Sequence, residues 1–393
     1  MISLSEGQQR ILALGGVVET EIVPLARAAG RWAAQDVTAR RTQPARDLSA
    51  MDGYALRHAD WPGPWTIIGE SAAGASFAGR VGTREAVRIF TGAALPQDAD
   101  TVIMQEDVAR AGECLRLTAD LEAFVGKHVR RAGEDFQAGQ TLIQAGERLT
   151  AARIALAAMG GHGDILVHRP VRVALLSSGD ELVPPGGATD ADHIPASNAV
   201  MLDAILRDFP CDIIHMGIIS DNKSALCDAF RTAATQADII LSTGGASVGD
   251  HDHVKPALEA AGAVIDFWKI AMRPGKPLMA GTLGKAVVLG LPGNPVSAFV
   301  TATLFALPLV RLMAGAVEPF AQRLPARLAS PLPAVPQRTD HVRAIYDNGS
   351  VTPVGLNDSA ALRALSLANA LIVRVAGSPA ANIGDAVEII LLA

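Results

Sequence analysis

The chain has 393 residues, of which 49% are hydrophobic and 4% aromatic, and its formal net charge is −6. This length is enough for roughly two to four domains, and the Ala, Val, Leu and Ile content suits a soluble α/β protein. The negative charge and the lack of a basic run interleaved with aromatics argue against nucleic-acid binding. The three cysteines have no C-x-x-C spacing, which indicates a reducing compartment rather than a zinc finger or a disulfide framework.

The N-terminal segment predicts a helix over residues 3–30, with Ser3 or Ser5 as its cap. The first residues lack the basic region and cleavage pattern of a signal peptide, so we expect a cytoplasmic protein. Residues 38–137 alternate short apolar runs with Gly, Pro and Asp, which is typical of a small β-rich domain. A short helix is expected over 149–161, where it ends at a glycine pair.

From residue 169 onward, apolar strands alternate with helices, which predicts a mostly parallel sheet covered on both faces. The apolar stretch 299–310 is too short to span a bilayer, and Pro308 interrupts it. We therefore expect a buried helix bent at the proline, and no association with a membrane. Residues 323–337 are rich in proline and indicate a stiff connector, and the residues that follow predict a small C-terminal β domain.

Three glycine-rich loops follow strands of this predicted sheet: SSGDEL at 177–182, STGGASVGDHD at 242–252 and LPGNPVS at 291–297. Because ligands of such sheets bind beside the carboxyl ends of the strands, we expect the three loops to lie together. Glycine N–H groups and a helix start can cradle a phosphate, while carboxylates hold Mg²⁺ nearby. The candidate residues are Ser178, Gly179, Glu181, Thr243, Gly244, Gly245, Ser247, Asp250, Asp252, Gly293, Asn294, Pro295 and Ser297.

Each loop alone could be an ordinary connection, because loops after strands are commonly rich in Gly, Ser and Asp. Lys269, Arg273 and Lys276 lie within eight residues around a Pro-Gly turn, which suits an oxyanion or a phosphate. A solvated charged turn is the alternative for them. His251 and His253 could ligate a transition metal, but exposed loop histidines are more often unliganded, so we assign them no ligand.

Eight distinctive sequence motifs, each present once, are spread along nearly the whole chain. They are the three loops above together with SAMDGYAL at 49–56, TGAALPQDADTVIMQEDV at 91–108, VRRAGEDF at 129–136, WKIAMRPGKPLMAG at 268–281 and NDSAALRALSLANALIV at 357–373. With these motifs the sequence resembles the molybdopterin molybdenumtransferases, bacterial proteins of molybdenum-cofactor biosynthesis that are related to the E domain of gephyrin.

The resemblance implies a multidomain α/β protein of four parts: an extended helical dimerisation region at 1–48 and 138–168, an inserted β-rich domain at 49–137, a doubly wound α/β molybdopterin-binding domain at 169–326 and a C-terminal β-barrel at 327–393. It implies that molybdenum from molybdate is inserted into adenylylated molybdopterin, with Mg²⁺-dependent release of AMP. The implied partners are a second copy of the chain, an upstream molybdopterin adenylyltransferase and a downstream cofactor carrier or nucleotide-modifying protein.

The same resemblance implies roles for individual residues. The acidic positions around the pterin and the metal are Glu181, Asp221, Asp250 and Asp252. The basic positions for molybdate and phosphate are Lys269, Arg273 and Lys276, and the loop that shapes the pterin site holds Pro292 and Pro295. The residues that would reach the site from the partner subunit are Asp52, Thr91 and Asp135. The expected catalytic residues are thus Asp52, Asp135, Glu181, Asp221 and Asp252, and the expected metal ligands are Glu181, Asp250 and Asp252.

One position departs from the family pattern, because Arg273 stands where a Lys-Pro-Gly-Lys-Pro motif begins with Lys. Arginine keeps the charge but presents a planar fork, so the oxyanion geometry and the preference between molybdate and tungstate stay open. Two other functions also stay open: a non-catalytic scaffold of the gephyrin type and an enzyme that adenylylates the pterin. The intact acidic and basic loops argue against the scaffold, and the four-part arrangement argues against the adenylylating enzyme.

Overall fold

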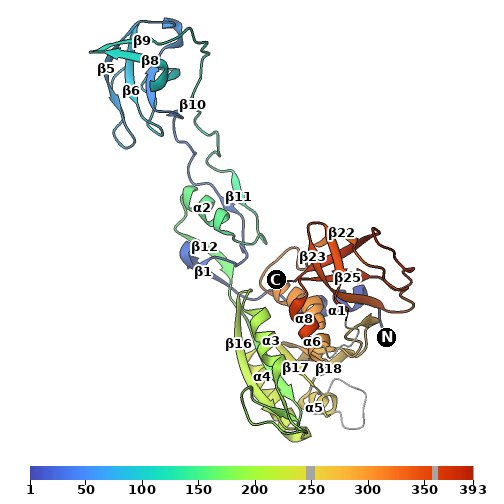
Figure 1. Ribbon diagram of the computed structural model, residues 1–393. Helices are drawn as coiled ribbons and strands as arrows, with labels where there is room; N and C mark the ends of the chain where they lie inside the picture. The colour runs from blue at the N-terminus through green and yellow to red at the C-terminus, as the bar shows by residue number, and fades with distance from the viewer. Residues whose placement is uncertain (245–252, 356–361, 393) are drawn as a thin grey trace.

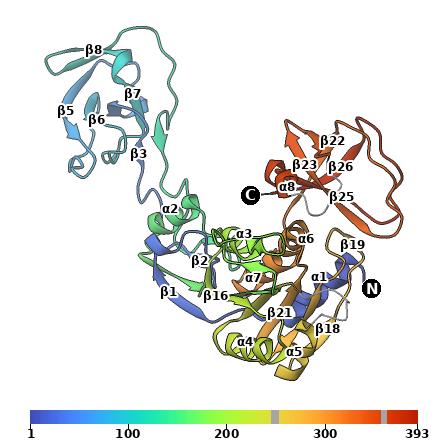
Figure 2. The same ribbon diagram turned by 60° about the horizontal axis from the view of Figure 1, so that its bottom comes forward.

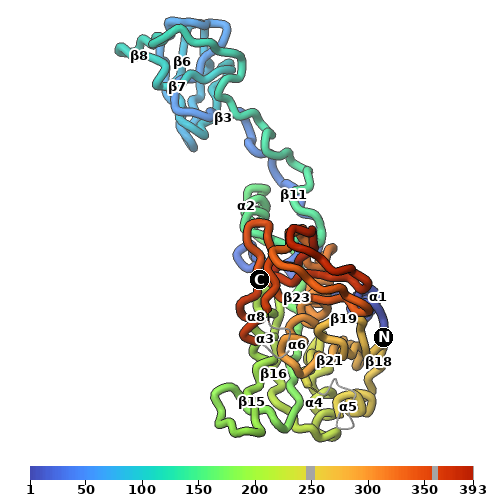
Figure 3. The backbone as a smooth tube through the Cα atoms, turned by 45° about the vertical axis from the view of Figure 1, so that its right-hand side comes forward, coloured from blue at the N-terminus to red at the C-terminus, as the bar shows by residue number. Residues whose placement is uncertain are grey.

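The computed structural model describes residues 1–244, 253–355 and 362–392, and the chain in it is elongated (Figure 1). A small β domain lies at one end, a narrow stalk follows, and a larger body at the other end holds an α/β domain and a β-barrel. Figure 3 shows the same arrangement from another side. The chain passes through the stalk twice, so the β domain is an insertion in it.

The N-terminal helix is shorter than the sequence predicts. Helix α1 covers Leu4–Leu14, and Ser3 caps it, because the Ser3 hydroxyl accepts a hydrogen bond from the Glu6 N–H at 3.1 Å. The predicted helix is wrong beyond Leu14, where two glycines and then a run rich in β-branched residues favour extended chain. Strand β1 (Thr20–Pro24) instead pairs antiparallel with β12 (Asp164–His168).

The β domain consists mainly of short strands, as the turn-rich sequence of 38–137 predicts, whereas the stalk combines short strands with helices. The stalk holds β1, the short helix η1 (Leu25–Arg27), β2 (Val37–Thr38), β11 (Thr141–Ile143), α2 (Ala151–Met159) and β12. The sheet of the β domain has the order β7-β4-β6-β5-β9-β8. Its strands are β4 (Gly53–Leu56), β5 (Trp65–Ser71), β6 (Glu85–Ile89), β7 (Thr101–Met104), β8 (Val108–Ala111) and β9 (Cys114–Leu117). The same part of the chain holds β3 (Leu48–Ser49), which pairs with β10 (Val129–Arg130), and the short helices η2 (His58–Asp60) and η3 (Gln105–Asp107).

The α/β domain contains a six-stranded sheet of order β16-β13-β17-β21-β20-β18. Its strands are β13 (Val171–Ser178), β16 (Cys211–Ile219), β17 (Ile239–Thr243), β18 (Val264–Phe267), β20 (Met279–Leu283) and β21 (Ala286–Leu291). The first four strands in this order are parallel, and β20 runs antiparallel to both of its neighbours, β21 and β18, which confirms a mostly parallel sheet. A separate pair, β14 (Leu182–Val183) and β15 (Ile194–Pro195), follows β13.

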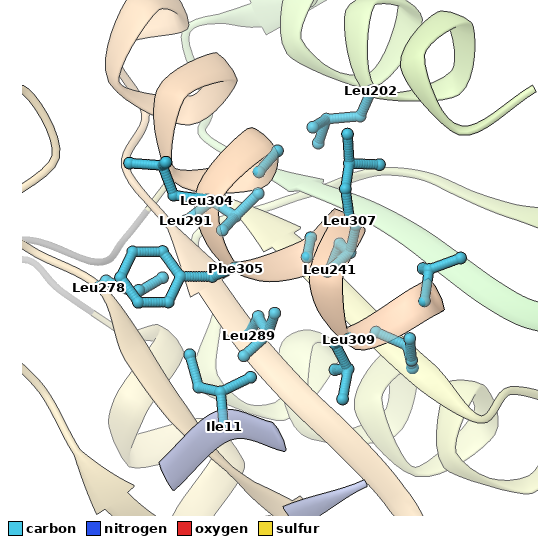
Figure 4. Close-up of a cluster of buried hydrophobic side chains, with 14 of the residues drawn as sticks. Ile11, Leu202, Leu241, Leu278, Leu289, Leu291, Leu304, Phe305, Leu307 and Leu309 are labelled. Carbon is cyan, nitrogen blue, oxygen red and sulfur yellow. The ribbon is translucent and has the colours of Figure 1, made fainter. Parts of the chain in front are cut away.

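Helices cover both faces of this sheet (Figure 2). One face packs against α1, α3 (Ser197–Leu206) and the helical run that follows β21, and the other packs against α4 (Lys223–Gln236) and α5 (Val254–Ala261). The α1 face holds the larger group of buried residues, among them Ile11, Leu241 and Leu289 (Figure 4). The strands of this sheet are apolar on both faces because helices cover both faces.

The predicted buried helix is confirmed as the central helix of the core. It runs from Pro295 to Met313, long and apolar enough to cross a membrane, but 78% of it is buried inside the protein. It consists of α6 (Pro295–Thr301), a π-helical turn η4 (Ala302–Ala306) and α7 (Leu307–Met313). The wider turn lies directly before Pro308, where the missing proline N–H interrupts regular helical bonding.

The C-terminal domain is a closed five-stranded barrel, as expected. Its strands are β22 (Arg323–Leu328), β23 (Thr339–Asp347), β24 (Ser350–Pro353), β25 (Ala370–Arg374) and β26 (Ala386–Leu391), with α8 (Leu362–Leu367) before β25. The order β23-β24-β22-β26-β25 closes because β25 pairs back to β23. The predicted connector over 323–337 is wrong in its first part, since β22 pairs with β26 from Arg323 to Arg327. One more strand, β19 (Met272–Arg273), joins this sheet from the α/β domain.

Arg169, Arg172 and Asp238 form a charge network at the amino-terminal ends of β13 and β17 in the α/β sheet. Arg169 donates two hydrogen bonds to the Asp238 carboxylate, at 2.7 and 2.9 Å, and Arg172 donates from its backbone N–H at 2.8 Å and its guanidinium at 3.0 Å. The Asp238 side chain is only 12% exposed. Burial raises its pKa, but the hydrogen bonds from the two arginines outweigh burial and hold that pKa well below its usual range.

Asp238→Asn is expected to lower the free energy of unfolding at pH 7 by about 2 kcal/mol, because it removes the buried carboxylate charge to which Arg169 and Arg172 donate. A carboxyl with a lowered folded-state pKa contributes stability that is complete above its unfolded pKa, near 3.9, and is lost as the pH falls below it. The gap between wild type and variant should therefore shrink below about pH 4. Urea unfolding at pH 7 and pH 3 measures it. Asp228→Asn, at a carboxylate 73% exposed, is the control, and an equal loss in both variants would contradict this account.

Candidate functional site

The carboxyl ends of four neighbouring parallel strands meet at one edge of the α/β sheet. In register, Ser177 of β13 lies opposite Thr243 of β17, and Thr243 lies opposite Leu291 of β21. On the other side of β13, Ser178 lies opposite Ile219, two residues before Asp221. This register confirms that the three glycine-rich loops begin side by side, as the alternation of strands and helices in the sequence predicts.

Glycines bring the three loops into direct contact. Gly244 has a φ of +91°, and a Cβ added there would lie 2.1 Å from the backbone oxygen of Ser178. A Cβ at Gly293 would lie 3.5 Å from the Gly244 Cα, so the third loop packs on the second. Only glycine permits both this backbone conformation and this approach at position 244.

Polar side chains of the first loop bond to the end of the neighbouring strand β16. The Ser178 hydroxyl donates to the Asp221 carboxylate at 2.5 Å, and the Asp221 N–H donates to the Asp180 carboxylate at 3.0 Å. Gly179 has a φ of +152°, and the Glu181 carboxylate lies against it, 2.5 Å from where a Cβ would be. Asp180, Glu181 and Asp221 therefore form an acidic rim at this edge.

The third loop leads into the central helix. Asn294 caps that helix by accepting a hydrogen bond from the Ser297 N–H at 3.2 Å, and Pro295 occupies its first turn. From α3, the Asn198 amide donates to the Gly293 carbonyl at 2.8 Å and fixes the loop. Pro292, the residue before Gly293, is buried. The structure thus brings the predicted residues of this loop to the same edge as the acidic rim.

Part of the predicted site lies outside the described residues: Gly245, Ser247, Asp250 and Asp252. Within the described ranges, no group of three or more His, Cys, Asp and Glu side chains lies close enough to hold a metal ion. Of the three predicted metal ligands, Glu181 is described, whereas Asp250 and Asp252 are not. The donor set as a whole consists of carboxylate oxygens, which are the hard ligands that Mg²⁺ prefers.

Residues 269–276, which include Lys269, Arg273 and Lys276, form a basic segment. This basic segment lies next to the edge of the sheet and packs on the central helix. Gly275, with a φ of +97°, lies so close to the helix that a Cβ there would be 2.5 Å from the Thr301 side chain. Arg273 pairs with Asp340 of the barrel strand β23, with 3.1 Å between Nε and the carboxylate. The Lys269 ammonium lies 6.0 Å from the centre of the Trp268 ring. In sequence, Lys269 precedes the Pro-Gly turn and Lys276 follows it.

A cavity of about 570 Å³ separates the basic segment from the barrel. From the α/β domain it is lined by Arg273, Lys276 and Ser297 among others, whereas Lys269 is not part of its lining. The structure therefore brings two of the three predicted basic residues together around one space. The lining contributed by the barrel includes Arg338, Asp340, His341, Arg343 and Arg374.

The sequence did not predict that these barrel residues or Asn198 belong to the site, whereas Asp180 lies in the predicted loop SSGDEL. One signal was available, because Arg374 interrupts the apolar run ALIVRV of 370–375. An arginine in such a run is rarely buried without a reason, since burial of its charge costs several kcal/mol unless it is paired.

The residues predicted to come from a partner subunit lie away from this edge within one chain. Asp52 accepts hydrogen bonds from the Thr91 N–H at 2.7 Å and the Thr91 hydroxyl at 2.8 Å. These bonds hold the pKa of Asp52 below its usual range. Both residues are exposed in the β domain, and Asp135 is exposed where the chain returns to the stalk. Figures 1 and 3 show the β domain at the end of the molecule opposite the α/β sheet.

Comparisons with known proteins account for this architecture. A family model described as the MoeA N-terminal region (domain I and II) matches residues 2–161, and one described as the MoeA C-terminal region (domain IV) matches residues 325–392. Between them, a model described as a probable molybdopterin binding domain matches residues 174–312. The chain belongs to the MoeA family.

Relatives with assigned activities are similar over most of their length. A protein of Haemophilus influenzae named molybdopterin molybdenumtransferase is 37% identical over 318 residues, which are 80% of this chain and 78% of that protein. A protein of Bacillus subtilis with the same name is 31% identical and spans 100% of this chain and 94% of its own. The crystal structure of the MoeA protein of Pyrococcus horikoshii OT3 covers 100% of both chains, with 26% identity and a TM-score of 0.86.

Proposed function

We propose that this chain is a molybdopterin molybdenumtransferase, which inserts molybdenum from molybdate into adenylylated molybdopterin and releases AMP. The observation that carries the proposal is the meeting of three glycine-rich loops at one sheet edge, beside a cavity lined by arginines and a lysine. A phosphorylated pterin and an oxyanion need these two kinds of surface next to each other. The names of the relatives from two bacteria support the same activity.

In this proposal the residues of the chain act mainly by binding and orienting two anionic substrates. The loop residues Ser178, Gly179, Thr243 and Gly244 and the start of the central helix would bind the phosphates of the adenylylated pterin, with Pro292 and Pro295 shaping its site. Arg273 and Lys276 would hold molybdate where the dithiolene sulfurs reach it, with Lys269 contributing charge from the other end of the turn. Fixed charges in a site that excludes water lower the barrier without reorganising during the reaction.

Mg²⁺ fits the carboxylate donors of the proposed site. Glu181, Asp250 and Asp252 would hold it, with Asp221 close by through its bond to Ser178. When bound, the ion supplies neutralising charge to the phosphoanhydride. The residues themselves would orient the phosphates.

We further propose that the active protein is a cytoplasmic homodimer in which Asp52, Thr91 and Asp135 of one subunit complete the site of the other. This would explain why these polar residues lie exposed and remote from the sheet edge of their own chain. The proposed parts are 1–48 with 138–168, 49–137, 169–326 and 327–393. An adenylyltransferase would supply the substrate, and a carrier or nucleotide-modifying protein would receive the product.

Asp252→Ala is expected to reduce AMP release at least tenfold, while the variant still folds and binds the pterin, because a proposed metal ligand is lost and the loops remain. AMP release from adenylylated molybdopterin is measured with molybdate across a range of Mg²⁺ concentrations. Asp228→Ala, a carboxylate on α4 away from the site, serves as the matched control. Unchanged AMP release in Asp252→Ala would remove Asp252 from the site.

A further inference from the structure

The three predicted basic residues divide into two groups in the structure. Arg273 and Lys276 line the cavity beside the barrel, whereas Lys269 does not. Lys269 instead follows the carboxyl end of β18, directly after Trp268. Because β20 runs antiparallel to both β21 and β18, strand β18 runs in the same direction as β21 and β17. Its carboxyl end therefore points to the sheet edge where the glycine-rich loops begin.

The register of the sheet shows how close Lys269 comes to that edge. Phe267 of β18 lies opposite Ala280 of β20, and Ala280 lies opposite Leu289 of β21. Leu291, two residues after Leu289, is the last residue of β21, and Lys269 is two residues after Phe267. Lys269 is thus level with the start of the third loop.

The indole ring of Trp268 holds two lysines at this edge. The Lys255 ammonium lies 5.0 Å from the centre of the ring, and the Lys269 ammonium lies 6.0 Å from it. Lys255 belongs to the first turn of α5, which begins two residues after the second loop and lies beside β18 in Figures 1 and 2. The face of an aromatic ring attracts an ammonium group, so both charges are fixed at one place.

Helix α5 gains little from a lysine at position 255. A positive charge in the first turn opposes the positive end of the helix dipole. Lys255 also pairs with Glu259, at 3.3 Å, but the Glu259 side chain is 52% exposed. Exposed pairs contribute little, and a lysine that precedes its glutamate by four residues is the weaker order. The stability of the helix therefore does not explain Lys255.

The described residues leave the charge of this lysine pair largely uncompensated. Asp266, the acidic residue nearest to Lys269 in sequence, bonds instead to Arg10 at 2.7 Å. Lys269 has no ion-pair partner among the residues that the structure describes. Two ammonium groups at one ring repel each other unless an anion lies between them. A compact ammonium group with three N–H donors suits the oxygens of a phosphate.

We infer that Lys255 and Lys269 bind the phosphoanhydride of the adenylylated substrate, as a second basic pair separate from Arg273 and Lys276. This inference rests on the proposed function and divides its two anions between the two pairs. The lysines at Trp268 bind the phosphates, and the pair at the cavity binds molybdate. Lys255, which has no other role in the proposed function, is then a substrate-binding residue.

The first test measures AMP release by the full-length protein while the concentration of one substrate is varied at a time. Lys255→Met keeps the apolar stem of the side chain and removes its charge. It should raise the KM for adenylylated molybdopterin about tenfold, which corresponds to the loss of one charged hydrogen bond, and leave the KM for molybdate within about twofold. Lys269→Met should give the same pattern, whereas Lys276→Met should raise the KM for molybdate.

Two further variants separate substrate binding from a structural role. Lys255→Arg keeps the charge and should keep the KM for adenylylated molybdopterin within about threefold of wild type, whereas a role in packing alone would leave Lys255→Met unaffected as well. Lys285→Met is the matched control, because Lys285 is exposed in the turn between β20 and β21, at the opposite edge of the same sheet.

The inference is overturned, and the proposed function left intact, if Lys255→Met and Lys269→Met keep a KM for adenylylated molybdopterin within twofold of that of Lys285→Met. Lys269→Met carries the test if Lys255→Met does not fold, as judged by its thermal melt.

Binding of ADP, which contains a phosphoanhydride, separates the inference from the proposed function. It is measured by titration calorimetry of the full-length protein with Mg²⁺ and without molybdate. If wild type releases no AMP, the proposed function falls. The lysine pair then still stands if Lys255→Met binds ADP at least fivefold more weakly than Lys285→Met, and it falls if the two bind equally or if wild type binds no ADP at millimolar concentration.

Discussion

Gly244→Ala is expected to lower AMP release by about a hundredfold and the free energy of unfolding by about 3 kcal/mol. The added Cβ would lie 2.1 Å from the Ser178 backbone oxygen, and a backbone oxygen cannot rotate away as a side chain can. The loop must therefore move by about 1 Å or more, and a displacement of that size near bound substrates costs on the order of a hundredfold in rate. The left-handed φ of +91° adds strain of roughly 1–3 kcal/mol.

Gly284→Ala is the control that separates these two effects. Gly284 lies in the turn between β20 and β21 of the same sheet, with a φ of +62° and no atom within 4 Å of an added Cβ. It should lose about 1 kcal/mol of stability and keep full AMP release. Urea unfolding and the AMP assay measure both variants. Equal activity in Gly244→Ala and Gly284→Ala would mean that the contact between the first two loops is not part of the site.

Mixing Asp52→Ala with Lys276→Ala is expected to restore activity that neither variant has alone. If each site combines Asp52 of one subunit with Lys276 of the other, a mixed dimer holds one site with both residues intact and one with neither. Random assembly gives half mixed dimers, so about a quarter of wild-type AMP release should return. The variants are unfolded together and refolded, or co-expressed with different tags.

A site built within one chain predicts the opposite result for this mixture. Each site would then carry one substitution, and the mixed dimers would be as inactive as their parents. Mixing Asp52→Ala with Thr91→Ala is the internal control, because both residues come from the same β domain and bond to each other. That pair should regain nothing in trans, since each mixed dimer still lacks one of the two at every site.

The edge of the sheet could be predicted because it follows from strand order alone. Parallel strands with apolar residues on both faces place their carboxyl ends together, so the loops after β13, β17 and β21 had to meet. The glycines at 244 and 293 then identify where the chain runs closely past itself. The buried central helix could be predicted for a similar reason, since it is apolar on all sides.

The opposite wall of the cavity could not be predicted, because it depends on contacts between segments far apart in sequence. The pairing of β19 with β23 brings Arg273 beside Asp340, and local patterns give no register between two domains. The end of α1 was missed because apolar spacing continued past Gly15 and Gly16, while β1 formed its hydrogen bonds with β12 instead. The first barrel strand, β22, was not predicted because it contains Pro325 and further prolines follow it closely.

The most direct test of the account is the release of AMP from adenylylated molybdopterin by the purified protein with Mg²⁺, with and without molybdate. The product is then added to a molybdoenzyme that lacks its cofactor. The account predicts that AMP release depends on molybdate and that the product activates the enzyme. Pterin binding without AMP release, with either molybdate or tungstate, would contradict it and would favour a non-catalytic scaffold; formation of adenylylated pterin from ATP would instead favour the adenylylating enzyme.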